Sequence, residues 1–205
     1  MVVKLKICGN ATLSDIIEIS KLDVDYVGIV TDPISQRFAK KEFIGFVKKY
    51  IGKPIVNVMV NIQINNKIVD ELKTSDYIQI HRVLNDSELE ILRSYDTKRI
   101  ILYVPASFEY KKYLDKVVNI VDMVLIDSVR KGVSVDFNVF ASFIREYPNL
   151  GVGGKINIEN ALSFINLNPA WIDISSSVEI YPGKKDLTKV KKIVEVVKYG
   201  DPFNK

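Results

Sequence analysis

Short apolar runs rich in β-branched residues recur along almost the whole chain, each bounded by polar or turn-forming residues. Runs of four to six residues with this composition are typical of strands buried on both faces of a sheet. The sequence therefore predicts eight strands, at Val3–Cys8, Tyr26–Val30, Ile55–Val60, Tyr77–His81, Arg99–Val104, Met123–Asp127, Asn149–Val152 and Trp171–Ser175.

Longer segments between and after these runs carry apolar residues at the three- and four-residue spacing of an amphipathic helix. They predict eight helices, at Leu13–Leu22, Lys41–Tyr50, Asn65–Lys73, Ser87–Tyr95, Glu109–Val118, Asn138–Tyr147, Ile158–Leu167 and Leu187–Lys198. Each predicted strand is thus followed by one predicted helix, which is the order found in parallel α/β proteins.

Eight successive strand–helix units close into a (β/α)₈ TIM barrel more readily than they form an open sheet. The alternative, an open doubly wound sheet, often carries a glycine-rich dinucleotide loop after its first strand. The turn Cys8-Gly-Asn10 is not such a loop. The connections are short throughout, so we expect one domain over residues 1–205, with a frayed tail at 200–205.

Composition and charge narrow the range of functions. The 205 residues are 47% hydrophobic, enough for a sizeable core, although the length is near the lower limit for such a barrel. The net charge is +4, but the lysines are spread along the chain. We therefore expect no nucleic-acid partner, and a small anionic substrate fits the charge equally well.

The chain has one cysteine and one histidine, which excludes an internal disulfide and a metal site rich in either residue. The N-terminus enters a charged strand pattern without a signal-peptide apolar region. No apolar stretch is long enough to cross a bilayer. We expect a cytoplasmic protein without membrane association, as a monomer or a homodimer.

Polar residues at strand ends are the first candidates for a site, because barrel active sites lie at the C-terminal ends of the strands. The candidates are Cys8 after strand one, Ser35-Gln-Arg37 after strand two, His81 after strand four, Asp127 after strand six, Gly153-Gly154 after strand seven and Asp173-Ile-Ser-Ser-Ser177 around the end of strand eight.

Side-chain alternation along two of these strands predicts a buried ion pair. Lys6 shares a face with Cys8, and Asp173 shares a face with Ser175. The first and eighth strands are neighbours in a closed barrel, so Lys6 and Asp173 should meet inside it. A nearby ammonium group would also favour the thiolate of Cys8.

The loops after the last two strands have the composition of a phosphate site. Glycines let backbone N–H groups approach an anion closely, and the segment Gly151-Val-Gly-Gly154 is followed by Lys155. Ser175, Ser176 and Ser177 add hydroxyl and amide donors. Barrels of this kind commonly bind phosphate at this place.

Ten segments, spread in order over nearly the whole chain, carry a resemblance. They are Lys6-Ile-Cys-Gly9, Val27-Gly-Ile-Val30, Ser35-Gln-Arg37, Val58-Met-Val-Asn61, Ile78-Gln-Ile-His81, Leu125-Ile-Asp127, Gly153-Gly154, Asp173-Ile-Ser-Ser176, Val178-Glu179 and Pro182-Gly-Lys-Lys-Asp186. Together they resemble the phosphoribosylanthranilate isomerases of tryptophan biosynthesis.

The resemblance implies an Amadori rearrangement of a phosphorylated sugar–anthranilate substrate, with no cofactor and no metal. It implies that Asp127 is the acid that opens the furanose ring and that Cys8 is the base that removes the C2′ proton. Arg37 would hold the anthranilate carboxylate, which suits a planar guanidinium group. The acid must be protonated near neutral pH, so the pKa of Asp127 should be raised by desolvation, and Cys8 should be partly thiolate.

The chain departs from the family pattern at three places. Arg82 stands where many relatives carry glycine after the histidine of strand four. The segment Arg130-Lys-Gly132 after strand six is shorter and more basic than usual, and Ser177 replaces a glycine. The departures concern the substrate loops and leave Cys8, Asp127 and Arg37 untouched.

Each candidate also has a purely structural explanation. Cys8 could be a small buried apolar residue, Asp127 could cap a helix, and Arg37 could be a solvated loop charge. We expect His81 to support the site by hydrogen bonding. The remaining residues with a structural explanation are Lys184-Lys185 and Lys191-Lys192 as solvated faces, and Phe140 and Phe143 as core.

Rival functions are other phosphate-binding barrels. An indoleglycerol-phosphate synthase would need a catalytic lysine and glutamate set with an N-terminal extension. A ribulose-phosphate epimerase would need several histidine and aspartate ligands, which one histidine cannot provide. A non-catalytic phosphosugar-binding barrel is a third possibility. The basic Arg130-Lys131 loop also leaves open the related aminoimidazole substrate of histidine biosynthesis.

Overall fold

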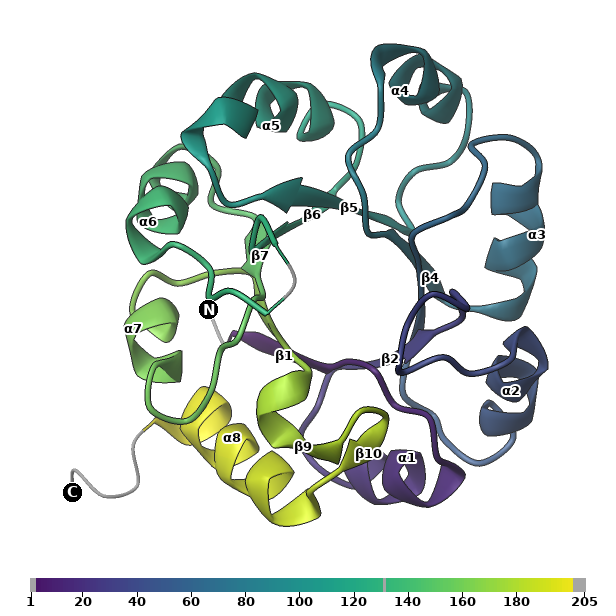
Figure 1. Cartoon of the computed structure of the whole chain (residues 1–205), viewed down its shortest axis with the longest axis vertical. Helices are drawn as coiled ribbons and strands as arrows, with labels where there is room; N and C mark the ends of the chain where they lie inside the picture. Colours follow the sequence, from purple (N-terminus) through teal and green to yellow (C-terminus); the bar gives the residue numbers. More distant parts are fainter. Residues whose placement is uncertain (1–2, 131, 201–205) are drawn as a thin grey trace.

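Eight parallel strands form a closed barrel in chain order, with the helices outside it (Figure 1). The computed structural model describes residues 3–130 and 132–200. The barrel strands are β1 Lys4–Ile7, β2 Tyr26–Val30, β3 Ile55–Met59, β4 Tyr77–Ile80, β5 Ile100–Pro105, β6 Met123–Asp127, β7 Leu150–Val152 and β8 Trp171–Ile174. The helices are α1 Leu13–Ser20, α2 Lys41–Val47, α3 Lys67–Thr74, α4 Asp86–Arg93, α5 Lys111–Val117, α6 Phe137–Glu146, α7 Ala161–Ile165 and α8 Leu187–Tyr199.

The predicted (β/α)₈ barrel is confirmed, and every strand and helix lies where the pattern placed it. The largest difference in length is at α7, which spans Ala161–Ile165 rather than 158–167. The preceding residues form a turn in which Asn157 and Asn160 each accept the other's backbone N–H, at 3.0 and 2.8 Å. Such side-chain bonds compete with helix formation, so the helix begins later.

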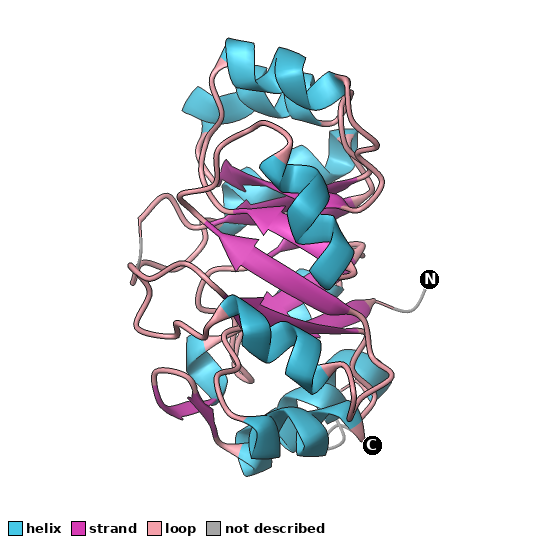
Figure 2. Cartoon of the chain, turned by 90° about the vertical axis from the view of Figure 1, so that its right-hand side faces the viewer, coloured by secondary structure: helices cyan, strands magenta, loops and turns pink. Residues whose placement is uncertain are grey.

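Two short elements after β8 were not predicted as strands. A 3₁₀ turn at Ser176–Val178 leads into an antiparallel hairpin of β9 Glu179–Tyr181 and β10 Lys184–Lys185. The strands of the barrel run toward the side that carries this hairpin, and β1 begins on the opposite side (Figure 2). Gly200 follows α8 with φ +79°, and the rest of the predicted tail lies outside the described residues.

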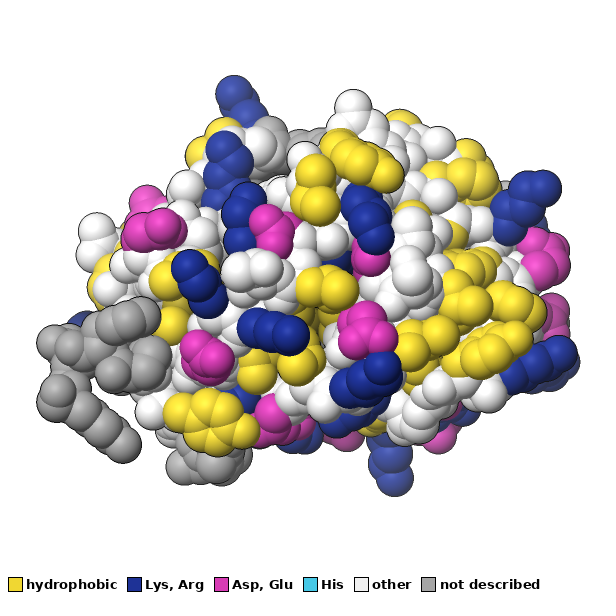
Figure 3. All heavy atoms as spheres, turned by 90° about the horizontal axis from the view of Figure 1, so that it is seen from below, with side chains coloured by type: hydrophobic (Ala, Val, Ile, Leu, Met, Phe, Trp, Pro, Cys, Tyr) yellow, Lys and Arg dark blue, Asp and Glu magenta, His cyan; other side chains and the backbone are white. Residues whose placement is uncertain are grey.

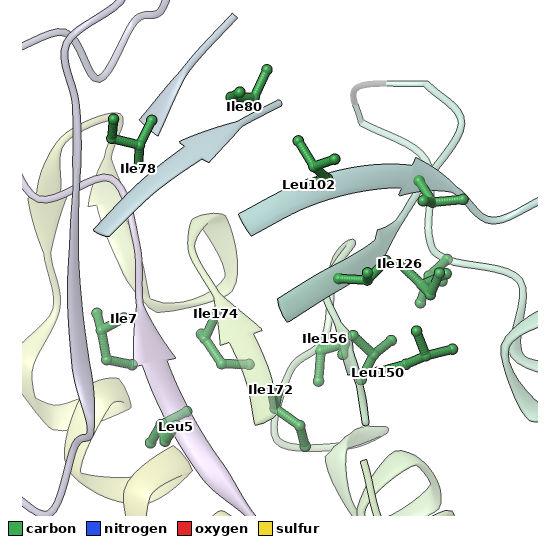
Figure 4. Packing of buried hydrophobic residues seen from close by; sticks show 14 of the residues in the cluster. Leu5, Ile7, Ile78, Ile80, Leu102, Ile126, Leu150, Ile156, Ile172 and Ile174 are labelled. Carbon is green, nitrogen blue, oxygen red and sulfur yellow. The ribbon is translucent and has the colours of Figure 1, made fainter. Parts of the chain in front are cut away.

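The alternation of side chains divides the buried residues into two layers. The outward-facing residues of the strands pack against the helices and form the larger core (Figure 4), with members such as Ile7, Ile78, Leu102 and Ile174. The predicted core residues Phe140 and Phe143 belong to it, at 0% and 1% exposure.

The inward-facing residues fill the lower barrel with a second apolar cluster that includes Tyr26, Val56 and Trp171. Trp171 occupies the space left by Gly151 on the neighbouring strand β7, because a Cβ on that glycine would lie 2.1 Å from the indole ring. Apolar side chains therefore fill the half of the barrel nearer the N-terminal ends of the strands. Space for a reactive site remains at the C-terminal ends.

The outer surface mixes charges of both signs. On the face over α8 and α1, Lys and Arg side chains alternate with Asp and Glu side chains and with apolar groups (Figure 3). This face does not offer the continuous positive stripe that nucleic acid selects. Among the described helices, we find none with the length and apolar character needed to span a bilayer.

Candidate active site

Cys8 sits immediately beyond β1 at the mouth of the barrel. Its backbone N–H donates to the carbonyl of Ile174 on β8 at 2.7 Å. Gly9 then turns the chain with φ +74°, a conformation that favours glycine. On the other side, β2 makes room for the thiol with Gly28, where a Cβ would lie 2.8 Å from Sγ. The side chain is buried, at 8% exposure, and points into the barrel.

A chain of hydrogen bonds crosses the barrel just below the mouth. The predicted pair is confirmed: Lys6 Nζ lies 2.7 Å from Asp173 Oδ2, in a fully buried position. The same ammonium group donates to Gln79 Oε1 at 2.9 Å. Gln79 Nε2 in turn lies 3.0 Å from Nδ1 of His81. One cation is therefore shared between strands β1, β4 and β8.

His81 is neutral in this arrangement. Burial lowers its pKa to about 4, and its ring packs on Tyr103 with the centroids 4.5 Å apart. Since the amide of Gln79 has an N–H to donate, Nδ1 is the acceptor and the ring proton lies on Nε2. This agrees with the predicted supporting role by hydrogen bonding.

Asp127 ends β6 and projects into the same mouth. Burial raises its pKa to about 6, although the backbone N–H and hydroxyl of Ser128 both donate to Oδ1 at 2.6 and 3.2 Å. The raised pKa is the one expected for an acid at neutral pH. The structural alternative of a helix cap is excluded, because the carboxylate of Asp136 caps α6.

The glycine pair after β7 makes room for this carboxyl group. A Cβ on Gly153 would lie 2.8 Å from Asp127 Oδ2, and a Cβ on Gly154 would lie 2.8 Å from Oδ1. The two glycines were predicted only for phosphate. Their contact with Asp127 gives them a second reason to lack side chains.

The pKa of Cys8 departs from the expectation. Burial raises it above the ordinary thiol value, and the nearby charges of Lys6 and Lys185 oppose the rise without cancelling it. The influence of Lys6 has the predicted sign, but the neutral thiol is the favoured form near pH 7.

Asp127 and Asp173 both border Gly153, where a Cβ would lie 2.8 Å from Asp127 Oδ2 and 3.5 Å from Asp173 Cβ. Asp173 pairs with Lys6, whose charge lowers the pKa of Cys8. Cys8 and Asp127 therefore both neighbour the Lys6–Asp173 pair.

Arg37 is paired rather than solvated. Its Nε and Nη2 donate to the two carboxylate oxygens of Glu179 at 2.8 and 2.6 Å. Its stem covers Gly9, where a Cβ would lie 2.4 Å from the arginine Cδ. The guanidinium group is thereby fixed next to the end of β1, and its Nη1 makes no hydrogen bond with the described residues.

The prediction that Lys184-Lys185 forms a solvated face was wrong. Lys185 is 1% exposed, and its ammonium group donates to the carbonyl of Cys8, the carbonyl of Ser175 and the carboxylate of Glu179. Lys184 is paired with the buried Asp15. The pairing of β9 with β10 shifts register between the two lysines, and a single-sequence pattern gives no sign of that irregularity.

The predicted phosphate residues occupy neighbouring loops. Gly154 and Lys155 both have positive φ, +96° and +55°, which turns the chain sharply after β7. Ser177 donates its hydroxyl to the carbonyl of Ile156 at 2.6 Å and so joins this loop to the one after β8. Ser176 begins the 3₁₀ turn, and Ser175 precedes it with φ −134° and ψ −85°, which is neither helical nor extended.

Arg82, one of the departures from the family pattern, has a structural role. It forms a two-fold pair with Glu88, at 2.9 and 2.6 Å, and donates to the carbonyls of Val60 and Ile62. It therefore ties the loop after β3 to α4. Of the basic loop after β6, Lys131 lies outside the described residues.

Sequence reasoning missed three residues of the site: Gln79, Glu179 and Lys185. Gln79 shares a strand face with His81, so the alternation that gave Lys6 could have found it. Glu179 lies in a segment noted only for its resemblance, and Lys185 was predicted to lie on a solvated face. Their partners are 142 and 177 positions away in the chain, and no local pattern predicts such contacts.

The fold and the site define a (β/α)₈-barrel enzyme with an elevated-pKa carboxyl group, a thiol and a fixed guanidinium group at one mouth. Among the described residues, no cluster of three or more His, Cys, Asp or Glu side chains is suited to a metal ion.

Comparison with known proteins identifies the family. A family model described as N-(5′-phosphoribosyl)anthranilate (PRA) isomerase matches residues 5–196. The chain is 72% identical over 204 residues to the N-(5′-phosphoribosyl)anthranilate isomerase of Saccharolobus solfataricus, which covers 99% of this chain and 100% of that one. It is 45% identical to that of Sulfolobus acidocaldarius, over 96% of each chain.

Solved structures agree. Phosphoribosyl anthranilate isomerase from Thermotoga maritima superposes with a TM-score of 0.82 at 25% identity, covering 96% of this chain and 98% of that one. A phosphoribosyl anthranilate isomerase in complex with reduced 1-(o-carboxyphenylamino)-1-deoxyribulose 5-phosphate gives 0.78 at 26% identity, over the same shares. The chain belongs to the N-(5′-phosphoribosyl)anthranilate isomerase family.

Proposed function

We propose that this chain isomerises N-(5′-phosphoribosyl)anthranilate in tryptophan biosynthesis, with Asp127 as the general acid and Cys8 as the general base. The observation that carries the assignment is the placement of both groups at one barrel mouth, with the pKa of Asp127 raised to about 6. A carboxylic acid with such a pKa retains a useful protonated fraction at neutral pH.

The first step is proton transfer from Asp127 to the furanose ring oxygen of the substrate. The bond between C1′ and the ring oxygen breaks as the anthranilate nitrogen donates its lone pair, which gives a protonated Schiff base and leaves Asp127 as a carboxylate. Gly153 and Gly154 allow the β7 loop to pack against the carboxyl group. That packing excludes water and so raises the pKa of the acid, which increases its protonated fraction at neutral pH.

The second step is removal of the C2′ proton by the thiolate of Cys8, which gives an enolamine that tautomerises to the ketone. Lys6 stabilises the thiolate, since its positive charge lowers the pKa of Cys8 against the effect of burial. The thiol formed is then available to return its proton. Both steps are proton transfers, so the chemistry asks for no cofactor.

Substrate contacts are assigned by the chemistry of the two ends of the molecule. Arg37 binds the anthranilate carboxylate, supported by its fixed position beside Gly9. The loops with Gly153, Gly154 and Ser175–Ser177 bind the phosphate, supported by the sharp turn at Gly154 and by their junction through Ser177. Because the Ser177 hydroxyl already donates to Ile156, backbone amides and the other serines are the donors in this assignment.

One assay tests the proposal. Loss of anthranilate-type fluorescence on freshly made phosphoribosylanthranilate, coupled to the next enzyme of the pathway, measures turnover. Asp127→Asn and Cys8→Ser should each lower kcat by about 10²–10⁴-fold, the range for removal of a general acid or base. Full activity in either variant would refute its assigned role. The same measurement on the aminoimidazole substrate decides whether that compound is accepted too.

We also propose that the chain works as one domain in the cytoplasm, as a monomer or a homodimer. The pairing of β1 with β8 supports a single folding unit. A substrate that carries both a phosphate and a carboxylate supports an intracellular site of action, since charged groups cross the bilayer core only at high cost. Sedimentation equilibrium distinguishes the two oligomeric states.

A further inference from the structure

A buried ion cluster lies beside the barrel mouth, outside the acid and base themselves. It consists of Glu179, Lys185 and Arg37, and it joins β10 and β9 to the loop after β2. The side chains of Glu179 and Lys185 are 5% and 0% exposed, and that of Arg37 is 16% exposed. Buried charges are costly unless fully paired, so such a cluster calls for an explanation.

Lys185 holds the backbone of the base. Its ammonium group has three donors, and these meet the carbonyl of Cys8, the carbonyl of Ser175 at 3.3 Å and Glu179 Oε1 at 3.0 Å. The N–H of Cys8 is held by Ile174. Both sides of the Cys8 residue are thus fixed, and the cation lies on the carbonyl side.

Glu179 holds the guanidinium group of Arg37. It accepts two hydrogen bonds from Arg37, one from Lys185 and one from the N–H of Gly183 at 3.1 Å. Burial alone would raise the pKa of Glu179, but Arg37 and Lys185 together hold it below its ordinary value. The carboxylate is therefore ionised and fully engaged.

We propose that Glu179 and Lys185 form one positioning unit that fixes both the base Cys8 and the carboxylate-binding Arg37, and that Lys185 also stabilises the Cys8 thiolate. This inference rests on the proposed function of those two residues. Neither Glu179 nor Lys185 touches the reacting atoms in this role. Glu179 binds both Arg37 and Lys185, so this one buried carboxylate sets the distance between the base and the substrate's carboxylate-binding residue.

The charged groups around the thiol come from three elements. Lys6 on β1 and Lys185 on β10 favour the thiolate, while Asp173 on β8 opposes it. Lys6 is neutralised directly by Asp173 at 2.7 Å. Asp173 offsets part of the influence of Lys6, so loss of the second cation, Lys185, should shift the titration of the thiol to higher pH.

The first test is the rate of Cys8 alkylation by iodoacetamide as a function of pH, a readout that does not require turnover. Lys185→Met should move the midpoint upward by about 1 pH unit, as expected for removal of a nearby opposite charge. Lys185→Gln, which keeps a donor for the Cys8 carbonyl, is a second variant for the case that the first fails to fold. An unchanged midpoint in either folded variant overturns the electrostatic role. Lys189→Met, at an exposed position of α8, is the control and should leave the profile unchanged.

The second test separates KM from kcat. Glu179→Gln should raise KM about tenfold and change kcat little, because Arg37 binds the carboxylate equally in the ground and transition states. Glu88→Gln is the matched control, since Glu88 makes the same two-fold pair with Arg82 away from the mouth. An unchanged KM in Glu179→Gln, or an equal rise in Glu88→Gln, contradicts the positioning of Arg37.

The two levels of the hypothesis can fail separately. If Cys8→Ser is fully active, the base assignment is wrong, whereas the alkylation profile still reports whether Lys185 acts on the thiol. If Cys8→Ser is inactive and the Lys185 profile is unchanged, the base assignment stands and the electrostatic role of Lys185 is refuted; an unchanged KM in Glu179→Gln refutes the positioning of Arg37.

Discussion

At the scale of single residues, the acid and the base have pKa values in an unusual order. The pKa of Asp127 is about 6, and burial raises that of Cys8 above the ordinary thiol value. The productive form needs a protonated Asp127 and an ionised Cys8, so it is the minor one of the two singly protonated forms. The enzyme works through a small population at every pH.

This order predicts the shape of the pH profile. Between the two pKa values, the protonated fraction of Asp127 falls with pH as steeply as the thiolate fraction of Cys8 rises, so their product is constant. We expect kcat/KM, which reports the free enzyme, to fall below pH about 6 and to stay level beyond the ordinary thiol pKa of about 8.5. Steady-state kinetics over this range checks it. A decline in kcat/KM that begins just above pH 6 would show that the pKa of Cys8 lies well below the ordinary thiol value.

Asp127 should also cost stability. Its pKa is raised from 3.8 to about 6, so the folded state holds the proton more tightly than the unfolded chain does. The contribution of Asp127 to stability is therefore most favourable below pH 4 and is lost as pH rises through 6. Asp127→Asn, which stays neutral, should be more stable than the wild type by about 1–3 kcal/mol at pH 8. Urea unfolding measures this difference in the free energy of unfolding, which should vanish as the pH approaches 3.5. A difference that persists at that pH would not come from the ionisation of Asp127.

Residue pairs divide into those that a sequence reveals and those that it does not. Lys6 and Asp173 could be predicted to meet, because strand alternation and barrel closure fix both positions. Arg37 and Glu179 could not, since neither lies within a regular barrel strand and their loops meet only after the chain has folded. The raised pKa of Asp127 followed from the required chemistry, while that of Cys8 depended on how completely the mouth is buried.

At the scale of elements, the β7 loop and the end of β6 are fitted to each other. Gly153→Ala should displace the Asp127 carboxyl group, because the new Cβ would lie 2.8 Å from Oδ2. Its φ does not lie in the left-handed region, so the effect is steric rather than conformational. We expect kcat/KM to fall about 10²-fold, comparable to misplacing a catalytic group by an ångström. We also expect a shift in the pH, near 6 in the wild type, below which kcat/KM declines.

Gly45→Ala is the matched control for this substitution. Gly45 lies within α2, and a Cβ there meets no atom within 4 Å. It should leave kcat/KM unchanged and stabilise the helix by about 0.5–1 kcal/mol. If Gly153→Ala is as active as Gly45→Ala, the glycine does not serve Asp127.

Element positions were predictable and element ends were less so. The spacing of apolar residues located all eight strands and all eight helices, because packing against the core requires apolar side chains at regular positions. The beginning of α7 was set by the Asn157–Asn160 turn, and the well-buried side chains of the β9–β10 hairpin, Glu179 and Lys185, are both charged. Elements this short bury too little apolar surface to leave a pattern in the sequence.

At the scale of the whole molecule, the reaction consists of proton transfers between groups of the chain and the substrate. We expect activity to survive dialysis against EDTA without loss. Fluorescence turnover before and after dialysis, with and without added Mg²⁺, measures this. A loss that Mg²⁺ restores would contradict the acid–base mechanism and would point to a phosphate-bridging cation.

Closure of the barrel by β1 and β8 has a consequence for biosynthesis. While the chain emerges from the ribosome, β1 and each newest strand present open edges until Trp171–Ile174 has been made. Asp173 is synthesised 167 residues after its partner Lys6, and Lys185 is synthesised 177 residues after its partner Cys8. The thiol therefore remains outside its final surroundings until Lys185 has been made, and a chain that ended before that residue would carry an exposed, unsupported cysteine that cellular oxidants and quality control can recognise.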